Sequence, residues 1–274
     1  MSPRTIRSLV AALGAGAIAV SMAPAATAAG GVVNAPMQKT HARAVLPVHG
    51  GTSSSLNWGG YVVTPATQDV TSVKSTFVVP KATLVPPGFA STWTGIGGYN
   101  TSDLIQAGVT ENSAASNALT GAQYGAWYEI LPASETPLTN CTGNAACTVT
   151  PGAHVTVAIT LVGTNLWDVS LADPTNHWTW DQQISYVSSE SSAEWILEAP
   201  TVGAQTVLAG VGTVHFGPVS SFRTASGGAV DQTIAQGDPT LVDLSPGVVN
   251  EATPSPLRKD GQSFDVCSWK QSCA

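Results

Sequence analysis

From Leu56 to the C-terminus, the sequence is a succession of short apolar or alternating runs. Runs such as WGGYVV, STWTGIGGY, HVTVAITLVG and LWDVSLAD are bounded by Gly, Pro, Asn and Ser. No long window carries a 3.6-residue apolar period with helix caps, and residues 227–240 could hold a short helical turn at most. Short strands separated by turn signals predict an all-β protein, an antiparallel sandwich, rather than a helical or βαβ fold.

The N-terminal residues differ in character from the rest. Arg4 and Arg7 precede an apolar run over 9–20 and the small residues at 26–28, which is the order of a secretory signal peptide. We predict a signal peptide over 1–28. Residues 29–55, rich in Gly, Ala, Pro and Ser, are predicted as a propeptide or flexible leader; such a leader could mask a cleft, and a disordered mature N-terminus is the alternative.

Residues 56–274 are predicted to form one folded domain. A chain of 274 residues, 43% of them hydrophobic, can bury a substantial core, and all-β domains often exceed 200 residues. No stretch beyond the signal approaches the roughly twenty apolar residues of a membrane-spanning helix. We therefore expect a secreted, extracellular protein without a membrane partner.

The four cysteines fall into two closely spaced pairs. Cys141 and Cys147 form one pair, and Cys267 and Cys273 form the other. In an oxidising compartment, this spacing favours two local disulfides over the two long-range pairings. A metal site is the further alternative, but the spacing is unlike a zinc knuckle and no histidine pair accompanies it.

Basic residues are scarce through most of the chain. Between Lys81 and Arg258, only Arg223 is basic, and the formal net charge is −7. Without a basic patch to bind phosphates, nucleic acid is excluded as an expected partner. Few ion pairs also make acid tolerance plausible, because acid unfolding acts mainly through paired carboxylates.

Two of the expected strands carry polar residues in a pattern that suggests a site. In Ser191–Glu198, a two-residue period puts Glu194, Ile196 and Glu198 on one face and Trp195 on the other. In Asp103–Val109, Gln106 points away from the apolar residues on either side of it. We predict that these strands bring one glutamate and one glutamine together on a sheet face. Surface positions for both are the simpler alternative.

Tryptophans accompany these polar residues. Trp58, Trp93 and Trp127 occur in short strand-like runs, and Trp127 shares a strand face with Glu129. An aromatic ring beside a carboxylate suits the wall of a groove, although it could also belong to a core. By contrast, the usual hydrolase signatures are missing, including a nucleophile elbow, a zinc-binding H-E-x-x-H and a nucleotide-binding glycine loop.

These motifs together resemble those of one family, the glutamic peptidases or eqolisins. The resemblance spans about Leu56 to Trp269 and rests on five motifs in the family's order: WGGYV, STWTGIGG, DLIQAGV, AWYEI and SSAEWILE. It implies a β-sandwich of two large sheets, of the concanavalin or jelly-roll kind, with the active site on the concave face. It also implies a secreted, acid-active endopeptidase with polypeptide substrates.

The resemblance places the catalytic pair on Gln106 and Glu194, and the cleft lining on Trp58, Trp93 and Glu129. Glu194 would be the general base for an attacking water, and Gln106 would hold that water and donate to the oxyanion. An amide does not titrate, and a glutamate with an ordinary pKa of about 4.3 is partly ionised in acid. No metal or cofactor is expected, and we expect a monomer.

Two positions depart from the family pattern. Fungal members carry aspartates where this chain has Gly97 and Gly125, so we predict a higher or broader pH optimum than theirs. Two other functions compete with this interpretation. One is a sugar-binding protein or glycoside hydrolase that would use Glu194 with Glu198 or Glu129. The other is an inactive peptide binder.

Overall fold

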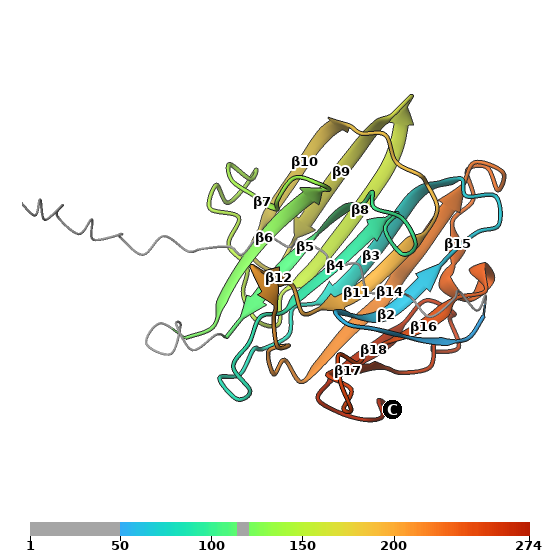
Figure 1. Ribbon diagram of the computed structural model, residues 1–274. Helices are drawn as coiled ribbons and strands as arrows, with labels where there is room; N and C mark the ends of the chain where they lie inside the picture. The colour runs from blue at the N-terminus through green and yellow to red at the C-terminus, as the bar shows by residue number, and fades with distance from the viewer. Residues whose placement is uncertain (1–49, 114–120) are drawn as a thin grey trace, which may run out of the picture. The chain divides into compact units, whose positions relative to one another are not determined.

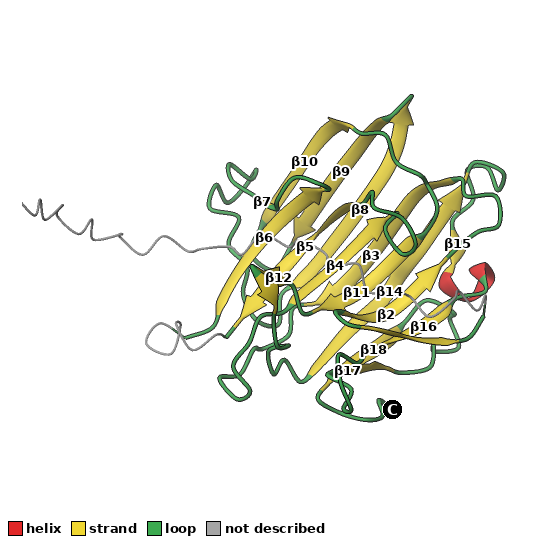
Figure 2. Ribbon diagram, in the orientation of Figure 1, coloured by secondary structure: helices red, strands yellow, loops and turns green. Residues whose placement is uncertain are grey.

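The computed structural model describes residues 50–113 and 121–274, and almost all of their regular structure is β-strand (Figures 1 and 2). The signal peptide predicted over 1–28 and most of the predicted leader lie outside the described residues. The elements are β1 (Thr52–Ser55), β2 (Trp58–Val63), β3 (Val70–Val78), β4 (Ser91–Ile96), β5 (Ile105–Asn112), β6 (Gln123–Ile130), β7 (Thr136–Pro137), β8 (His154–Gly163), β9 (Leu166–Asp173), β10 (Trp178–Ser185), β11 (Ala193–Glu198), β12 (Thr201–Val202), β13 (Ala204–Gln205), β14 (Thr213–Thr224), β15 (Gln232–Thr233), η2 (Ile234–Gly237), β16 (Thr240–Leu244), β17 (Ala252–Pro254) and β18 (Phe264–Ser268).

The strands form two layers joined along one hydrogen-bonded path. We call the strands in the order β10-β9-β8-β3-β14-β18 the β3 layer, and those in the order β16-β2-β11-β4-β5-β6-β7 the β11 layer; β17 connects the two (Figure 1). Apart from the parallel pair β1 and β16, the strand pairs of the described residues are antiparallel. The predicted all-β, antiparallel sandwich is confirmed.

The main hydrophobic core lies between the layers. Trp195 and Leu197 of β11 point into it, as the two-residue period predicted. The indole Nε1 of Trp195 donates a hydrogen bond of 2.8 Å to the backbone oxygen of Lys74 on β3, which links the two layers. Buried aromatic rings carry large apolar areas, so this contact contributes both burial and register between the layers.

The β3 layer follows the ordinary alternation of a half-solvated sheet. Along β9, Trp167, Val169 and Leu171 are buried in the core, whereas Asp168 and Ser170 are only half-buried. Side chains of a strand alternate between the two faces, so this pattern means that one face meets the core and the other meets water.

Both predicted local disulfides are present. One joins Cys141 to Cys147, and the other joins Cys267 to Cys273 near the C-terminus. Each closes a short loop at the end of strands, so it fixes local chain geometry rather than the pairing of distant strands.

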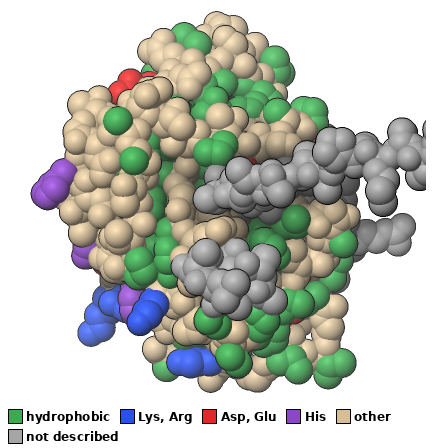
Figure 3. All heavy atoms as spheres, turned by 90° about the vertical axis from the view of Figure 1, so that its left-hand side faces the viewer, with side chains coloured by type: hydrophobic (Ala, Val, Ile, Leu, Met, Phe, Trp, Pro, Cys, Tyr) green, Lys and Arg blue, Asp and Glu red, His purple; other side chains and the backbone are tan. Residues whose placement is uncertain are grey.

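The folded unit starts before Leu56. Strand β1 (Thr52–Ser55) lies inside the range predicted as leader, yet it pairs in parallel with β16. Its sequence, TSSS, has no apolar period that could have predicted it. The described residues include no helix with the length and apolar character of a membrane span. Charged side chains are few on the face in Figure 3 and lie towards its edges.

Candidate active site

The register of five neighbouring strands puts the predicted polar residues in one row across the β11 layer. Glu194 on β11 pairs with Val62 on β2 and with Gly95 on β4. Gly95 pairs in turn with Gln106 on β5, and Gln106 pairs with Glu129 on β6. We call Val62, Glu194, Gly95, Gln106 and Glu129 the glutamate row. The structure thus brings Glu194 and Gln106 together, on the face opposite the core.

Gly95 lies between the two predicted catalytic residues. Adjacent strands lie about 4.8 Å apart, so the Cα atoms of Glu194 and Gln106 are roughly 10 Å apart, with only a glycine between them. A Cβ atom on Gly95 would lie 3.0 Å from the ring of Trp93 and 3.1 Å from the Cβ atom of Gln106. The glycine therefore places no side chain of its own between Glu194 and Gln106, and a larger residue here would crowd Trp93 and Gln106.

Glu129 fixes the orientation of the glutamine amide. The Nε2 atom of Gln106 donates a hydrogen bond to Oε2 of Glu129. A carboxylate can only accept, so this contact assigns the amide nitrogen to the side of Glu129 and the amide oxygen to the other side. The Oε1 atom of Gln106 has no hydrogen-bond partner, and the residue is 1% exposed. The amide thus retains one free acceptor and a second N–H.

The predicted tryptophans lie on the same face as the glutamate row. They belong to a second apolar cluster, separate from the main core, that comprises Trp58, Val62, Trp93, Leu104, Trp127, Ile196 and Val242. Trp58 and Trp93 pack edge to face, with ring centroids 4.9 Å apart and planes at 77°. The Nε1 atom of Trp127 is buried without a hydrogen-bond partner. This cluster supplies aromatic surface and a spare donor beside the row.

A second glycine makes room for Trp93. Gly108 on β5 pairs with Trp93 on β4 and with Trp127 on β6. A Cβ atom on Gly108 would lie 2.6 Å from the Cβ atom of Trp93 and 2.2 Å from the backbone oxygen of Thr92. Since real Cβ atoms do not approach so closely, only glycine allows this spacing of the strands.

Glu198, two strand repeats from Glu194, holds Trp93 in place. Its carboxylate accepts 2.7 Å and 2.8 Å hydrogen bonds, from Nε1 of Trp93 and from Nδ2 of Asn57 respectively, and it is 1% exposed. A carboxylate engaged in this way is poorly placed to serve as the second acid of a glycosidase. Sequence reasoning considered Glu198 only in that role, although the period of β11 already placed it on the face of Glu194.

Glu135 adds a carboxyl group that the sequence did not reveal. It lies in the connection between β6 and β7, and both of its carboxyl oxygens are buried without a hydrogen-bond partner. Burial, together with the nearby charge of Glu198, raises the pKa of Glu135 from 4.5 to about 8. Glu135 is therefore protonated in acid. No periodic signal marks a loop residue, so the pattern that found Glu194 could not find Glu135.

The surroundings of Gly97 explain why this position lacks a side chain. Its backbone φ is +83°, which favours glycine, and a Cβ atom there would lie 2.8 Å from Oδ2 of Asp103. Burial acts to raise the pKa of Asp103, but hydrogen bonds from Ser189 and Thr101 outweigh it and hold the pKa below its usual value. An ionised carboxylate from the next loop thus already lies beside position 97.

Comparison with known proteins agrees with the geometry. A family model described as the Peptidase A4 family matches residues 56–250. A crystal structure of scytalido-glutamic peptidase with a transition state analog inhibitor is similar, with a TM-score of 0.60 and 18% identity over 77% of this chain and 98% of that one. The structure of SCP-B, of the eqolisin family of peptidases, in complex with the tripeptide Ala-Ile-His gives a TM-score of 0.57 with the same identity and coverage.

At 18% identity, the likeness to these structures is one of fold. A comparison with curated protein sequences found no match. The family model covers most of the chain, including the whole glutamate row. The fold and the matched region define a β-sandwich hydrolase that acts on peptide bonds. The chain belongs to the Peptidase A4 family, and the enzyme is a glutamic peptidase.

Proposed function

We propose that this enzyme is a secreted, acid-active endopeptidase that hydrolyses polypeptides by direct attack of water, with Glu194 and Gln106 as the catalytic pair. The observation that carries the proposal is the glutamate row, in which Glu194 and Gln106 lie on either side of Gly95 and no other side chain of that row stands between them. A carboxylate and an amide placed on either side of one glycine can both reach a single water molecule and the carbonyl carbon that it attacks.

Glu194 acts as the general base and then as the general acid. Its ionised carboxylate takes a proton from the water as the oxygen attacks the scissile carbonyl, and it returns this proton to the leaving nitrogen when the C–N bond breaks. The water supplies the hydroxyl of the new carboxyl group, so no covalent intermediate forms on the enzyme. The apolar cluster around the row lowers the local dielectric and strengthens these charge interactions.

Gln106 holds the water and stabilises the tetrahedral intermediate. Its free Oε1 accepts a hydrogen bond from the water, while the N–H that Glu129 does not engage donates to the developing oxyanion. Glu129 is the positioning residue that keeps this N–H aimed. An amide neither gains nor loses a proton across the acid range, so the oxyanion stabiliser remains intact where the base is partly ionised.

The aromatic cluster forms the substrate-binding wall. Trp58, Trp93 and Trp127 offer apolar surface to substrate side chains, and Nε1 of Trp127 is free to donate to a substrate backbone carbonyl. A second structure of scytalido-glutamic peptidase holds a peptide-based transition state analog, and the SCP-B structure holds a tripeptide, so both ligands belong to the same chemical class. Polypeptides are thus the substrates that we assign, without a metal or an organic cofactor.

Secretion and the pH range belong to the same proposal. Two disulfides suit an oxidising compartment and agree with a signal peptide over 1–28 followed by a removable leader. N-terminal sequencing of the exported protein tests both boundaries, and its mass in solution tests the expected monomer. The pH optimum of the activity is expected to be higher or broader than in fungal members. Those members carry aspartates at the positions of Gly97 and Gly125, and this chain has no carboxylate at either position to influence Glu194 and Gln106.

The test is casein hydrolysis from pH 2 to 7 by the wild type, Glu194→Gln and Gln106→Ala. Pepstatin, a metal chelator and a serine-protease inhibitor are added in separate assays, and Gln182→Ala on exposed β10 serves as the matched control. We expect inhibitor-resistant activity that falls by a factor of about 10³ or more in both site variants and persists in the control. Activity that survives in Glu194→Gln would refute the assignment.

A further inference from the structure

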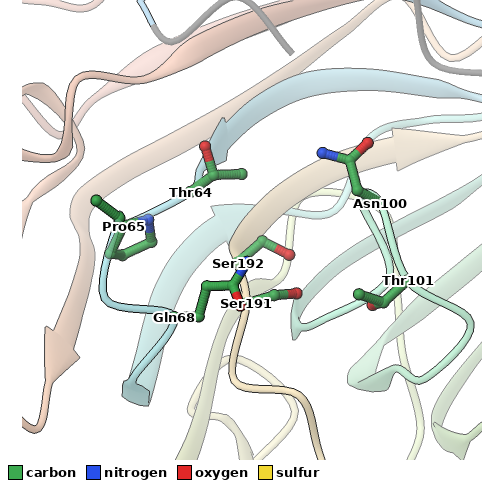
Figure 4. Close-up of a pocket in the computed structure, with 8 residues that line it drawn as sticks. Thr64, Pro65, Gln68, Asn100, Thr101, Ser191 and Ser192 are labelled. Carbon is green, nitrogen blue, oxygen red and sulfur yellow. The ribbon is translucent and has the colours of Figure 1, made fainter. Parts of the chain in front are cut away.

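We propose that a polar pocket next to the glutamate row is a specificity subsite for an uncharged, hydrogen-bonding side chain of the substrate: Ser, Thr, Asn or Gln. The inference rests on the proposed function and names the substrate class of the same site. The pocket has a volume of about 380 Å³, and its polar lining is Thr64, Gln68, Asn100, Thr101, Ser191 and Ser192 (Figure 4).

The pocket continues the catalytic face of the β11 layer. The backbone N–H of Gly97 donates 3.0 Å to the oxygen of Ser192, which extends the pairing of β4 and β11 by one residue in the same register. Ala193 and Val63 face the core, so Ser192 and Thr64 face the other side, as Glu194 does. Two residues along a strand span about 7 Å, so the pocket lies about that far from Glu194.

This distance matches the repeat of an extended peptide. Alternate side chains of an extended chain fall on one side at intervals of about 7 Å. A substrate whose scissile carbonyl lies between Glu194 and Gln106 therefore places a side chain within two residues of the cut at the pocket. In the lining of the pocket, Ser192 lies between Thr64, just after β2, and the Asn100–Thr101 loop (Figure 4).

Ser192 supplies the unused hydrogen-bonding group. The neighbouring hydroxyls are engaged: Oγ of Ser191 bonds to that of Ser189 at 2.9 Å, and Oγ1 of Thr101 accepts the N–H of Gly98 at 2.8 Å. The Oγ atom of Ser192 is buried without a partner, and the residue is 1% exposed. A buried hydroxyl without a partner destabilises the site, and a bound amide or hydroxyl would satisfy it.

The absence of charge in the lining sets the selectivity. None of the lining residues is charged, and Pro65 and Ala66 are apolar. A substrate lysine, arginine or carboxylate would lose its hydration here without gaining a counter-ion, and a purely apolar side chain would leave Ser192 unsatisfied. A neutral amide or hydroxyl avoids both penalties.

Cleavage-site profiling on a randomised peptide library tests the subsite. We expect Ser, Thr, Asn and Gln to be enriched about tenfold over apolar isosteres such as Val at one position within two residues of the cut. Ser192→Ala should remove this enrichment, whereas the matched surface variant Ser226→Ala should keep it. An unchanged profile in Ser192→Ala would overturn the proposal.

A gain of specificity tests the pocket without loss of a buried group. Gln68 lies exposed at the rim, so Gln68→Lys adds a cation without disturbing the core. We expect acidic residues to become enriched at the same substrate position, because the lysine supplies their counter-ion. If Asp and Glu stay excluded at that position, the pocket does not contact the substrate.

Binding to Glu194→Gln separates this inference from the catalytic assignment. Two peptides that differ only by Thr or Val at the selected position are titrated against this variant and against Glu194→Gln/Ser192→Ala. A preference for the Thr peptide that depends on Ser192 supports the subsite even if the wild type cleaves nothing. Cleavage by the wild type without any preference in either assay overturns the subsite and leaves the proposed peptidase mechanism intact.

Discussion

Strand β9 of the β3 layer alternates buried and half-buried residues, whereas β11 of the other layer buries all six of its residues. The outward side chains of β9 include Asp168 and Ser170, which meet water. Those of β11 include Glu194 and Glu198, whose exposed fractions are 0% and 1%. Burying carboxylates costs free energy, and a fold gains no stability from doing so. The difference teaches that the central strands of the β11 layer, β2, β11, β4 and β5, lack a solvated face where the predicted catalytic residues lie.

Crowded glycines occur in both layers, since a Cβ atom on Gly217 of β14 would lie 2.3 Å from Oγ of Ser263, but those of the β11 layer lie beside the predicted site. In the β11 layer, Gly95 and Gly108 sit between large or polar side chains on neighbouring strands, where a Cβ atom would be crowded. In the β3 layer, a Cβ atom on Gly163 would make only an ordinary contact, 3.5 Å from the Cβ atom of Leu166. Glycine within a strand normally weakens it, so its presence in the β11 layer reflects the space that the site needs.

The largest effect is expected from alanine at the crowded glycine. Gly108→Ala should lower the free energy of unfolding by about 3 kcal/mol, because its Cβ atom would collide with the Thr92 backbone. Gly163→Ala in the β3 layer should change it by less than about 1 kcal/mol. Urea denaturation of both variants measures the difference, and equal effects would break the comparison between the layers.

A smaller effect is expected from the buried carboxylates that hold other side chains. Glu198→Ala should lower kcat/KM by about tenfold by releasing Trp93, and Glu198→Gln should restore most of it. Asp173→Ala is the matched variant in the β3 layer, since Asp173 is buried and accepts two hydrogen bonds from Asn176. Asp173→Ala should lower the free energy of unfolding by about 2 kcal/mol, as the loss of Glu198 should, but it should leave kcat/KM unchanged. If it lowered kcat/KM as Glu198→Ala does, Trp93 would not be the cause.

The smallest effect concerns the pH dependence of stability. Glu111 of β5 lies on the core face of the strand, where burial raises its pKa well above the usual value and Thr92 offsets only part of the shift. Because its pKa is raised in the folded state, the contribution of Glu111 to folding stability is fully present below about pH 4.5 and is lost as the pH rises. The raised pKa of Glu135 has the same effect, and its contribution is lost between pH 4.5 and about 8.

A carboxylate bound to two side chains of the β3 layer has a pKa shifted in the opposite direction. Burial acts to raise the pKa of Asp231, but hydrogen bonds and charges from Arg223 and Lys74 outweigh it, so the pKa is lowered and this contribution to stability is lost only in strong acid, below about pH 3.8. We expect the Tm to be highest near pH 4 to 5 and to decline towards pH 8. Glu111→Gln should flatten this decline. A Tm that rises from pH 5 to 8 in the wild type would contradict the account.

Strand periodicity predicted the faces of the site strands but not their partners. The alternation in SSAEWILE placed Trp195 in the core and Glu194 opposite it, because a strand has a fixed two-residue period. That β11 lies between β2 and β4 depends on pairings between residues far apart in the chain, which no local pattern encodes. The motifs of the glutamic peptidases supplied Gln106 as the partner, and the register shows how Gly95 separates the two.

Other features escaped the sequence for specific physical reasons. Glu135 lies in a loop, and β1 has no apolar period because its backbone, rather than its side chains, joins it to β16. The polar pocket is built by three segments, 64–68, 100–101 and 191–192, that meet only at the end of paired strands. Features that depend on one strand could be read from the sequence, and those that depend on where strands end could not.

The most direct test of the proposed catalytic pair is kcat/KM of Gly95→Ala on a peptide substrate at the pH optimum. The added methyl group would lie between Glu194 and Gln106, with its nearest contacts at 3.0–3.1 Å, so the neighbouring atoms would have to shift by a few tenths of an ångström. We predict a fall in kcat/KM of about 100-fold or more, with a change in unfolding free energy of no more than about 2 kcal/mol. Activity within twofold of the wild type would show that the reacting water does not lie between these two residues.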